Sequence, residues 1–154
     1  MANTVSLREP STGDAEVFYL HQLEAEACRM AAFPSRDHAA FTAHWAKTSA
    51  DPSNTRLTIL SDGRPAGYVA CFSRFELREV CYWVGKEFWG KGVATKGLAL
   101  FLERIQERPL HARVAKSNPA SLRVVQKCGF VIVAEETYSD HNGVQIEEFL
   151  LKLS

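Results

Sequence analysis

A strand pattern, a glycine-rich turn and a helix pattern follow one another without a break between residues 79 and 105. Glu79–Val84 is rich in aromatic and β-branched residues, which favours a strand. From Ala94 onward apolar residues recur at helical spacing, until Pro109 prevents the helix from continuing. A strand that leads through a short turn into an amphipathic helix needs a sheet with that helix packed on one face. The segment therefore predicts a domain that combines a sheet with helices.

Further helices are predicted on both sides of this segment. Asp14 can cap a helix that reaches about Ala31, and Ser35 can cap a second helix soon afterwards. Asn118-Pro119 combines a capping residue with proline at the first helical position. Gly129 can end that helix in a left-handed conformation.

Six other stretches have the pattern of strands, with turn residues such as Asp62-Gly63 and Asn142-Gly143 between them. These stretches are Val5–Arg8, Arg56–Leu60, Pro65–Phe72, Leu110–Ala115, Phe130–Tyr138 and Val144–Leu153. The order β-α-α-β-β-β-α-β-α-β-β predicts an α+β fold with a mixed sheet and helices on its faces. At 154 residues, the chain is expected to form a single domain over 1–154.

The composition argues against several classes of protein. No stretch approaches the ~20 apolar residues that a membrane helix needs, and Met1–Pro10 lacks the apolar core of a signal peptide. The cysteines form no CxxC pair and no Cys/His metal pattern, and all lie in apolar stretches. They are Cys28, Cys71, Cys81 and Cys128. We expect buried free thiols, no metal, no membrane partner and a cytoplasmic location.

Charge is unevenly distributed along the chain. Basic and acidic residues balance overall, so a general affinity for nucleic acid is not expected. Between Lys86 and Lys127, however, nine Lys or Arg residues stand against three Glu residues. This basic block is either a solvated surface or the binding face for a partner that carries several phosphates.

The turn between the strand and the helix has the composition of a phosphate-binding loop. Gly90, Gly92 and Ala94 keep it free of bulky side chains, so backbone N–H groups can approach a ligand closely. The start of the following helix adds unpaired donors and the positive end of its dipole. The segment therefore suits a pyrophosphate, although a glycine pair alone also fits an ordinary tight turn.

Two nucleotide-binding motifs come close to this turn and fail. Gly85-x4-Gly90-Lys91 copies most of a P-loop, but Gly92 replaces the Ser or Thr that would hold Mg²⁺. Gly90-x-Gly92-x-x-Thr95 begins like a dinucleotide fingerprint and lacks its third glycine. A nucleotide-binding P-loop protein is therefore a weak alternative.

Two blocks of the chain resemble the GNAT N-acetyltransferases. Trp89-Gly90-Lys91-Gly92-Val93-Ala94 is similar to the family's acetyl-CoA motif, (Gln/Arg)-x-x-Gly-x-(Gly/Ala), with Trp89 where Gln or Arg is usual. Asn118-Pro119-Ala120-Ser121 and Lys127-Cys128-Gly129-Phe130 resemble its Asn-x-x-Ser and Lys-x-Gly-Phe signatures, in the expected order and spacing. The Tyr-Trp entry and the Trp-Gly-Lys-Gly turn are similar to the RimJ/RimL-like branch, which acetylates protein N-termini and other amines. The resemblance covers nearly the whole chain.

The resemblance implies acetyl-CoA as cosubstrate and a mostly antiparallel sheet with helices on both faces. In this family the strand before the turn splays from its neighbour and holds the pantetheine arm, while the turn holds the pyrophosphate. The implied cofactor-binding residues are Trp83, Val84, Trp89, Gly90, Lys91, Gly92, Val93, Ala94, Thr95, Asn118 and Ser121. The candidates for the outer phosphates, which otherwise are solvated cations, are Lys91, Lys96, Arg123 and Lys127.

Acetyl transfer to an amine needs a neutral amine, a polarised carbonyl and a proton for the leaving thiolate. A backbone N–H near Val84 is expected to polarise the carbonyl. Glu79 is the predicted general base, acting directly or through water, because it lies on the strand that would carry the acetyl group. Glu76 is the second candidate. The alternative role for Glu79 is an ion pair with Arg74 or Arg78.

The residue expected to act as general acid differs from the one found in much of the family. Many members carry a tyrosine four residues before the Gly-Phe pair, where this chain has Val125. Ser121 is the predicted acid, because RimJ/RimL-like members have a serine there. A capping contact of Ser121 and a proton from water are the alternatives.

The resemblance points to the acceptor side without naming the amine. The first two helices and the last hairpin line that side in the family, so Met30–Asp37, Tyr138 and His141 are candidates, whereas Phe33 and Trp45 are expected in the core. The acceptor is a protein N-terminus, an antibiotic, a polyamine or an amino acid. A coenzyme A-binding regulatory module without catalysis is the alternative function, and a homodimer is left open.

Overall fold

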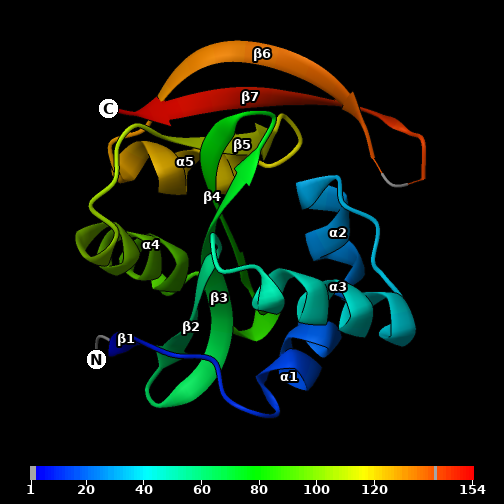
Figure 1. Cartoon of the computed structure of the whole chain (residues 1–154), viewed down its shortest axis with the longest axis vertical. Helices are drawn as coiled ribbons and strands as arrows, with labels where there is room; N and C mark the ends of the chain where they lie inside the picture. The colour runs from blue at the N-terminus through cyan, green and yellow to red at the C-terminus, as the bar shows by residue number, and fades with distance from the viewer. Residues whose placement is uncertain (1–2, 141) are drawn as a thin grey trace.

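A computed structural model describes residues 3–140 and 142–154, and within them seven strands form one sheet (Figure 1). Across the sheet the order is β1 (Val5–Arg8), β2 (Thr55–Ser61), β3 (Arg64–Arg74), β4 (Leu77–Val84), β5 (Leu110–Ala115), β7 (Gln145–Leu153) and β6 (Val131–Ser139). The contacts between neighbouring strands are antiparallel except between β4 and β5. The predicted α+β fold with a mixed, mostly antiparallel sheet is confirmed.

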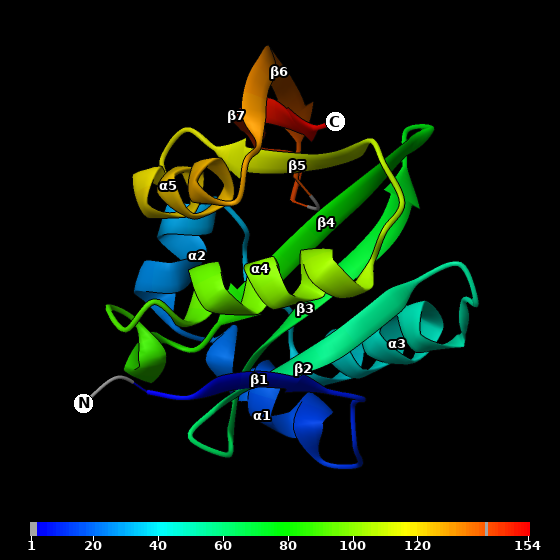
Figure 2. The ribbon, with the colours of Figure 1, turned by 90° about the vertical axis from the view of Figure 1, so that its left-hand side faces the viewer.

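The parallel contact between β4 and β5 is short. In the described residues these strands are in register at one pair, Glu79 with His111. By contrast, β3 and β4 stay paired from Gly67–Val84 to Arg74–Leu77. Beyond Glu79, β4 and β5 diverge and leave one edge of β4 unpaired (Figure 2). The sheet therefore opens at its centre.

Helices cover both faces of the sheet, as expected. α1 (Asp14–His21), α2 (Ala25–Ala31) and α3 (His38–Ala50) lie on one face, whereas α4 (Val93–Arg104) and α5 (Pro119–Lys127) lie on the other (Figure 1). The short 3₁₀ helix η1 (Lys86–Phe88) connects β4 to the glycine turn. The N-terminus of α4 and the helix α5 flank the opening between β4 and β5 (Figure 2).

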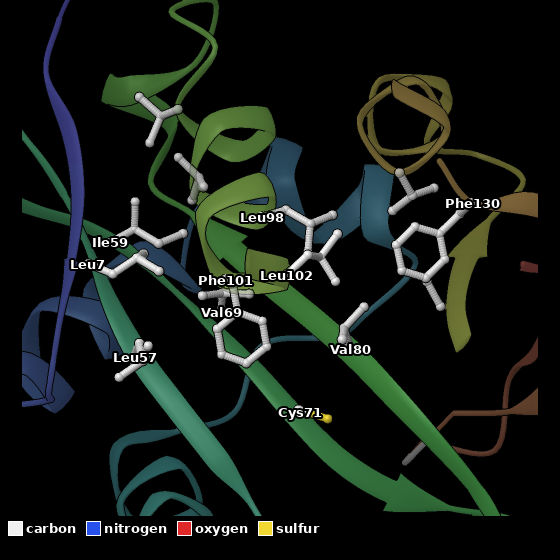
Figure 3. Packing of buried hydrophobic residues seen from close by; sticks show 14 of the residues in the cluster. Leu7, Leu57, Ile59, Val69, Cys71, Val80, Leu98, Phe101, Leu102 and Phe130 are labelled. Atoms are coloured by element: carbon white, nitrogen blue, oxygen red, sulfur yellow. The ribbon is translucent and has the colours of Figure 1, made fainter. Parts of the chain in front are cut away.

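The main core lies between α4 and the β2–β4 half of the sheet (Figure 3). Leu98 and Phe101 of α4 are fully buried against Ile59 and Val69. Burying side chains of this size is worth about 1.5–3 kcal/mol each. Gly97 permits the close approach, because a Cβ at that position would lie 2.8 Å from Cδ1 of Ile59. This packing fixes the start of α4 relative to β4.

The N-terminal helices differ from the prediction. The single helix expected from Asp14 to about Ala31 is two helices, α1 and α2, interrupted at residues 22–24. Asp14 is not the cap, since Gly13 holds that position and the buried Asp14 carboxylate instead accepts hydrogen bonds from Arg8 and Thr58. Ser35 is not the cap of α3, because Asp37 accepts the hydrogen bond from the N–H of Ala40.

The cysteines also differ from the prediction of four buried thiols. All four lie in the described residues and are free, but Cys71 alone is buried. Cys28 and Cys128 are half-buried, and Cys81 is exposed to an internal cavity. None of the helices described in residues 3–140 and 142–154 has the length and apolar character needed to cross a membrane.

Candidate active site

One cavity of about 1530 Å³ reaches both faces of the sheet. On the α4/α5 side its lining includes Gly92 and Asn118, and on the α2/α3 side it includes Phe33 and Arg36. Trp83 and Val84, at the end of β4 beside the opening, line it as well. A cofactor on one face and an acceptor on the other can therefore meet at the opening between β4 and β5.

The glycine turn forms the end of the cavity at α4. Gly90 and Gly92 have φ of 77° and 74°, a conformation that favours glycine. Gly92 is the N-cap of α4, and the first helical hydrogen bond runs from Lys96 N–H to the Gly92 carbonyl. The N–H groups of Val93–Thr95 thus have no acceptor within the helix. They form a row of donors facing open space, as an anion requires.

Trp89 holds this turn against the sheet. Its indole Nε1–H donates to the Val84 carbonyl over 3.0 Å, and the ring is half-buried against the core. The neighbouring Phe88 is buried, and the Lys91 ammonium lies 5.9 Å from its ring centroid. Trp89 therefore supports the turn by its side chain, where Gln or Arg is usual in the resembling motif.

The unpaired edge of β4 presents backbone donors to the opening. The Gly85 N–H donates to the Ala66 carbonyl of β3 over 2.9 Å. Because successive N–H groups of a strand point to opposite sides, those of Val84 and Tyr82 point away from β3, toward the gap before β5. The predicted donor near Val84 thus has the required direction.

The start of α5 brings two hydroxyl groups together. Asn118 caps the helix by accepting from the Ser121 N–H over 3.2 Å. The Ser121 Oγ lies 2.5 Å from the Tyr82 Oη, and burial raises the pKa of Tyr82 to about 12. Val125, at the position of the missing tyrosine, is buried in the core. The sequence analysis missed Tyr82, although the alternation of β4 sends it to the opposite face from Trp83.

The predicted base lies in a buried ionic cluster. Glu79 is 2 % exposed, and its Oε2 accepts from the Arg113 Nε over 2.9 Å. Arg113 also pairs with Glu148, over 3.3 Å, and with Glu136. Glu79 is thus paired with Arg113 and not with Arg74 or Arg78, the two alternatives from the sequence.

Glu148 was not predicted, because a carboxylate in an alternating strand normally faces solvent. Here the side chain of Glu148 lines the cavity and is buried, and this burial raises its pKa against the opposing effect of Arg113. Glu76 is exposed in the turn between β3 and β4, at φ 65°, and does not contribute to the cavity lining.

The other predicted residues divide between the cavity and the surface. All of the predicted cofactor-binding residues line the cavity except Lys91, and of the other cations proposed for the outer phosphates Arg123 and Lys127 line it whereas Lys96 does not. Phe33 and Trp45 are not core residues, since both are half-buried and line the acceptor side. Met30, Arg36 and Tyr138 line it too, and His141 lies outside the described residues.

The comparisons with known proteins agree with this geometry. Residues 4–131 match the family model of the acetyltransferase (GNAT) domain. The chain belongs to the GNAT acetyltransferase family. A search of curated proteins found no match to this GNAT domain.

Solved structures share the fold of this GNAT domain at low identity. A spermidine N-acetyltransferase from Vibrio cholerae, in complex with CoA and spermine, is 18 % identical, with a TM-score of 0.80 over 97 % of this chain and 94 % of that one. Mycobacterium smegmatis RimJ, in complex with CoA-disulfide, is 20 % identical, with a TM-score of 0.78 over 97 % and 81 %. The microcin C7 self-immunity acetyltransferase MccE, in complex with acetyl-CoA and AMP, is 18 % identical, with a TM-score of 0.76 over 97 % and 91 %.

Proposed function

We propose that this GNAT domain transfers the acetyl group of acetyl-CoA to a primary amine. The observation that carries the proposal is the single cavity that joins the uncapped start of α4 to the chamber under α2 and α3. Its lining contains a row of backbone N–H groups at one end and carboxylates and aromatic rings at the other. Donor and acceptor can therefore enter from opposite faces.

The residues on the α4/α5 side fit the cosubstrate. The N–H groups of Val93–Thr95 are unpaired, and a Cβ at Gly92 would meet only the Lys96 Cε, at 3.8 Å, so the approach to them is open. We propose that they hold the pyrophosphate and that the free edge of β4 holds the pantetheine arm. When bound, acetyl-CoA supplies the acetyl group as a thioester. The Val84 N–H would polarise its carbonyl.

Direct transfer replaces one bond to the acetyl carbon by another and moves one proton from nitrogen to sulfur. The amine nitrogen bonds to the acetyl carbon, the carbon–sulfur bond breaks, the amine loses a proton and the sulfur gains one. We propose that Glu79 takes the amine proton, acting through water because Arg113 occupies one of its oxygens. Ser121, hydrogen-bonded to Tyr82, would supply the proton to sulfur.

The branch of the family and the class of acceptor are proposed from similarity to known proteins. We propose a RimJ/RimL-like enzyme whose acceptor is a protein N-terminus or a small-molecule amine, supported by the shared fold with RimJ and by the quoted motifs. A cytoplasmic location is supported by the four free cysteines.

A homodimer is supported by exposed apolar residues on the edge strand β6, namely Val131, Ile132 and Val133. Sedimentation at several concentrations tests the homodimer.

Calorimetry with acetyl-CoA and an acceptor screen together test the proposal. Free thiol release is followed with a panel of amines that contains peptides, polyamines, amino acids and aminoglycosides. We expect saturable binding and thiol release that depends on one class of amine. Absence of binding at high micromolar acetyl-CoA would overturn the proposal. Tight binding without transfer to any amine would favour the regulatory module.

A further inference from the structure

Arg36 and Arg56 lie on the acceptor side of the cavity, and like Arg74, which lies nearer Glu148, they form no ion pair among the described residues. Arg36 and Arg56 are both half-buried. Half-buried guanidinium groups normally meet a carboxylate, because desolvating an unpaired charge is unfavourable. Burial accordingly lowers the pKa of both. A ligand anion would complete these sites.

Both guanidinium groups are held in place by neutral contacts. The Arg36 backbone is clamped by the buried Gln22 side chain, whose Oε1 accepts from the Arg36 N–H over 2.7 Å and whose Nε2 donates to the Arg36 carbonyl over 3.0 Å. The Arg36 guanidinium lies 4.9 Å from the Phe33 ring centroid. The Arg56 guanidinium stacks 3.3 Å from the Trp45 ring centroid and donates to the Thr48 hydroxyl over 2.8 Å. The Arg56 guanidinium also donates to the Ser49 hydroxyl and to the Trp45 carbonyl and is thus fixed directly, whereas the Arg36 guanidinium is held through its backbone and the Phe33 ring.

The groups around these arginines leave their charge uncompensated. Tyr68 acts electrostatically on both arginines, and Cys81 acts on Arg56. Desolvation by the surrounding protein raises the pKa of Tyr68, and it raises that of Cys81, which lines the cavity, to about 12, so both stay neutral. Burial, followed by Arg36 and Arg56, lowers the pKa of the neighbouring His44, which therefore adds no positive charge at neutral pH. Glu9 and Asp51 also line the cavity, but in the described part of the chain neither forms an ion pair with Arg36 or Arg56, so both guanidinium charges stay unpaired.

The opposite end of the same sheet face carries net negative charge. Arg113 meets three carboxylates there, those of Glu79, Glu136 and Glu148, and Arg74 adds a second positive charge near Glu148, so one negative charge remains. Arg56 of β2 pairs with Ala70 of β3, which in turn pairs with Cys81 of β4. Glu79 lies two residues before Cys81 on β4 and therefore on the same face of the sheet. Strand spacings of about 5 Å and about 7 Å between same-face residues put the Cα atoms of Arg56 and Glu79 roughly 12 Å apart. Both residues line the same cavity.

We infer that the acceptor is a small zwitterion, a primary amine that also carries a carboxylate or phosphate group. Its ammonium lies at the Glu79–Glu148 end, beside the opening to the cosubstrate, and its anionic group binds Arg36 and Arg56. Phe33, Trp45 and Met30 offer apolar surface for a side chain between the two charges. The inference rests on the proposed acetyl transfer and selects against polyamines, which have no anion for the arginines.

Matched acceptors test the inference. Thiol release is measured with L-methionine, L-methioninamide, 2-aminoethyl phosphate, ethanolamine and spermidine. We expect kcat/KM to be roughly 10- to 100-fold higher for methionine than for its amide, the usual effect of charged hydrogen bonds. The amide's less basic amine is more often neutral, so intrinsic reactivity opposes this preference. A preference for 2-aminoethyl phosphate over ethanolamine would extend the site to phosphates. Equal or better use of the amide, or of spermidine, would overturn the inference.

Two arginine variants and a matched control locate the effect. Arg36→Gln should remove most of the preference for methionine over the amide and leave the affinity for acetyl-CoA unchanged, because the cosubstrate residues lie on the other face. Arg36→Lys should retain part of the preference. Arg29→Gln removes the same charge from an exposed position on α2 and should change neither quantity. A preference that survives Arg36→Gln in full would contradict the inference.

Binding gives a readout that does not depend on turnover. Calorimetry should show that the CoA-loaded protein binds N-acetylmethionine. It should bind N-acetylmethioninamide at least tenfold more weakly. Equal affinities, or no binding of either product, would overturn the inference. Failure of the proposed function is distinct, because it appears as thiol release with none of the amines or as no binding of acetyl-CoA.

Discussion

The Tyr82 Oη and the Ser121 Oγ lie 2.5 Å apart and join β4 to α5 across the cosubstrate side of the opening. Val125, three residues before Cys128 on the same helix, is buried and offers no hydroxyl group. Ser121 lies one helical turn before Val125, so Tyr82 of the strand brings a hydroxyl group close to the position at which the resembling motif has a tyrosine. Because burial raises the pKa of Tyr82 to about 12, it stays protonated over the working range of an enzyme.

Removing the Tyr82 hydroxyl should slow catalysis more than binding. Tyr82→Phe keeps the ring in the core and leaves Ser121 without its partner. We expect kcat to fall about 10- to 100-fold, at the low end for an acid–base group because water can replace it. The Kd for acetyl-CoA, measured by calorimetry, should change less than threefold. Tyr19→Phe, at a half-buried tyrosine of α1 outside the cavity lining, is the control. An unaltered kcat under conditions where chemistry limits the rate would exclude the pair from proton transfer.

A β-branched residue at Gly92 should abolish cosubstrate binding. Gly92 has φ 74° and the space beside it is open, so Gly92→Val adds methyl groups where the phosphates are proposed to lie. We expect the Kd for acetyl-CoA to rise at least about 100-fold, the effect of losing charged hydrogen bonds. Gly63→Val is the matched control, because Gly63 has φ 81° and open surroundings in the distant β2–β3 turn. Equal loss of binding in both variants would mean that backbone strain, not the ligand contact, is responsible.

Asp14 should make stability depend on pH in acid. Burial alone would raise its pKa, but hydrogen bonds from Arg8, Ser11 and Thr58 lower it from 3.8 to about 2. A depressed folded-state pKa contributes stability that is present above the unfolded value and lost as pH falls from about 4 to about 2. Asp14→Asn should therefore lower the free energy of unfolding by about 2 kcal/mol at pH 7.

Urea unfolding at several pH values checks the Asp14 prediction. The difference between wild type and Asp14→Asn should shrink below pH 4 and nearly vanish at about pH 2. Glu103→Gln, at an exposed glutamate of α4, should have little effect at any pH. A difference that is as large at pH 3 as at pH 7 would assign the effect to packing instead of charge.

The sequence predicted the strands and the cosubstrate turn well because their signals are local. β5 has the predicted bounds, Leu110–Ala115. Pro109 precedes it, and the cap of the next helix, Asn118, follows shortly after it. The turn Asp62-Gly63 has positive φ at both residues, as its type requires. Asn118 caps α5 as predicted, and Gly92, predicted as part of the turn, proves to be the N-cap of α4.

The acceptor side was predicted less well because it depends on contacts between distant segments. Arg113 gathers carboxylates from three other strands, and nothing near it in the chain indicates which ones. Glu148 looks like a solvent-facing residue of an edge hairpin, but β7 lies between β5 and β6 in the sheet and Glu148 pairs with Ala115 of β5. Trp45 has the pattern of a core residue, but it packs against Phe18 and Tyr68 with one side and lines the cavity beside Arg56 with the rest.

Glutamine substitutions at Glu79 and Glu148 should identify the general base. Both carboxylates line the cavity and both pair with Arg113, but burial raises the pKa of Glu148 and so brings it closer to that of an efficient base. If Glu79 is the base, Glu79→Gln should lower kcat by about 10²–10⁴-fold with little change in the KM for acetyl-CoA. Glu148→Gln should then lower kcat much less. The deficit of the inactive variant should shrink as pH rises, because more of the amine is neutral without assistance. Arg78→Gln, which breaks an ion pair with Glu107 outside the cavity, controls for lost charge. A larger fall in kcat for Glu148→Gln than for Glu79→Gln would identify Glu148 as the base. Near-normal kcat in both variants would mean that water accepts the proton of the amine.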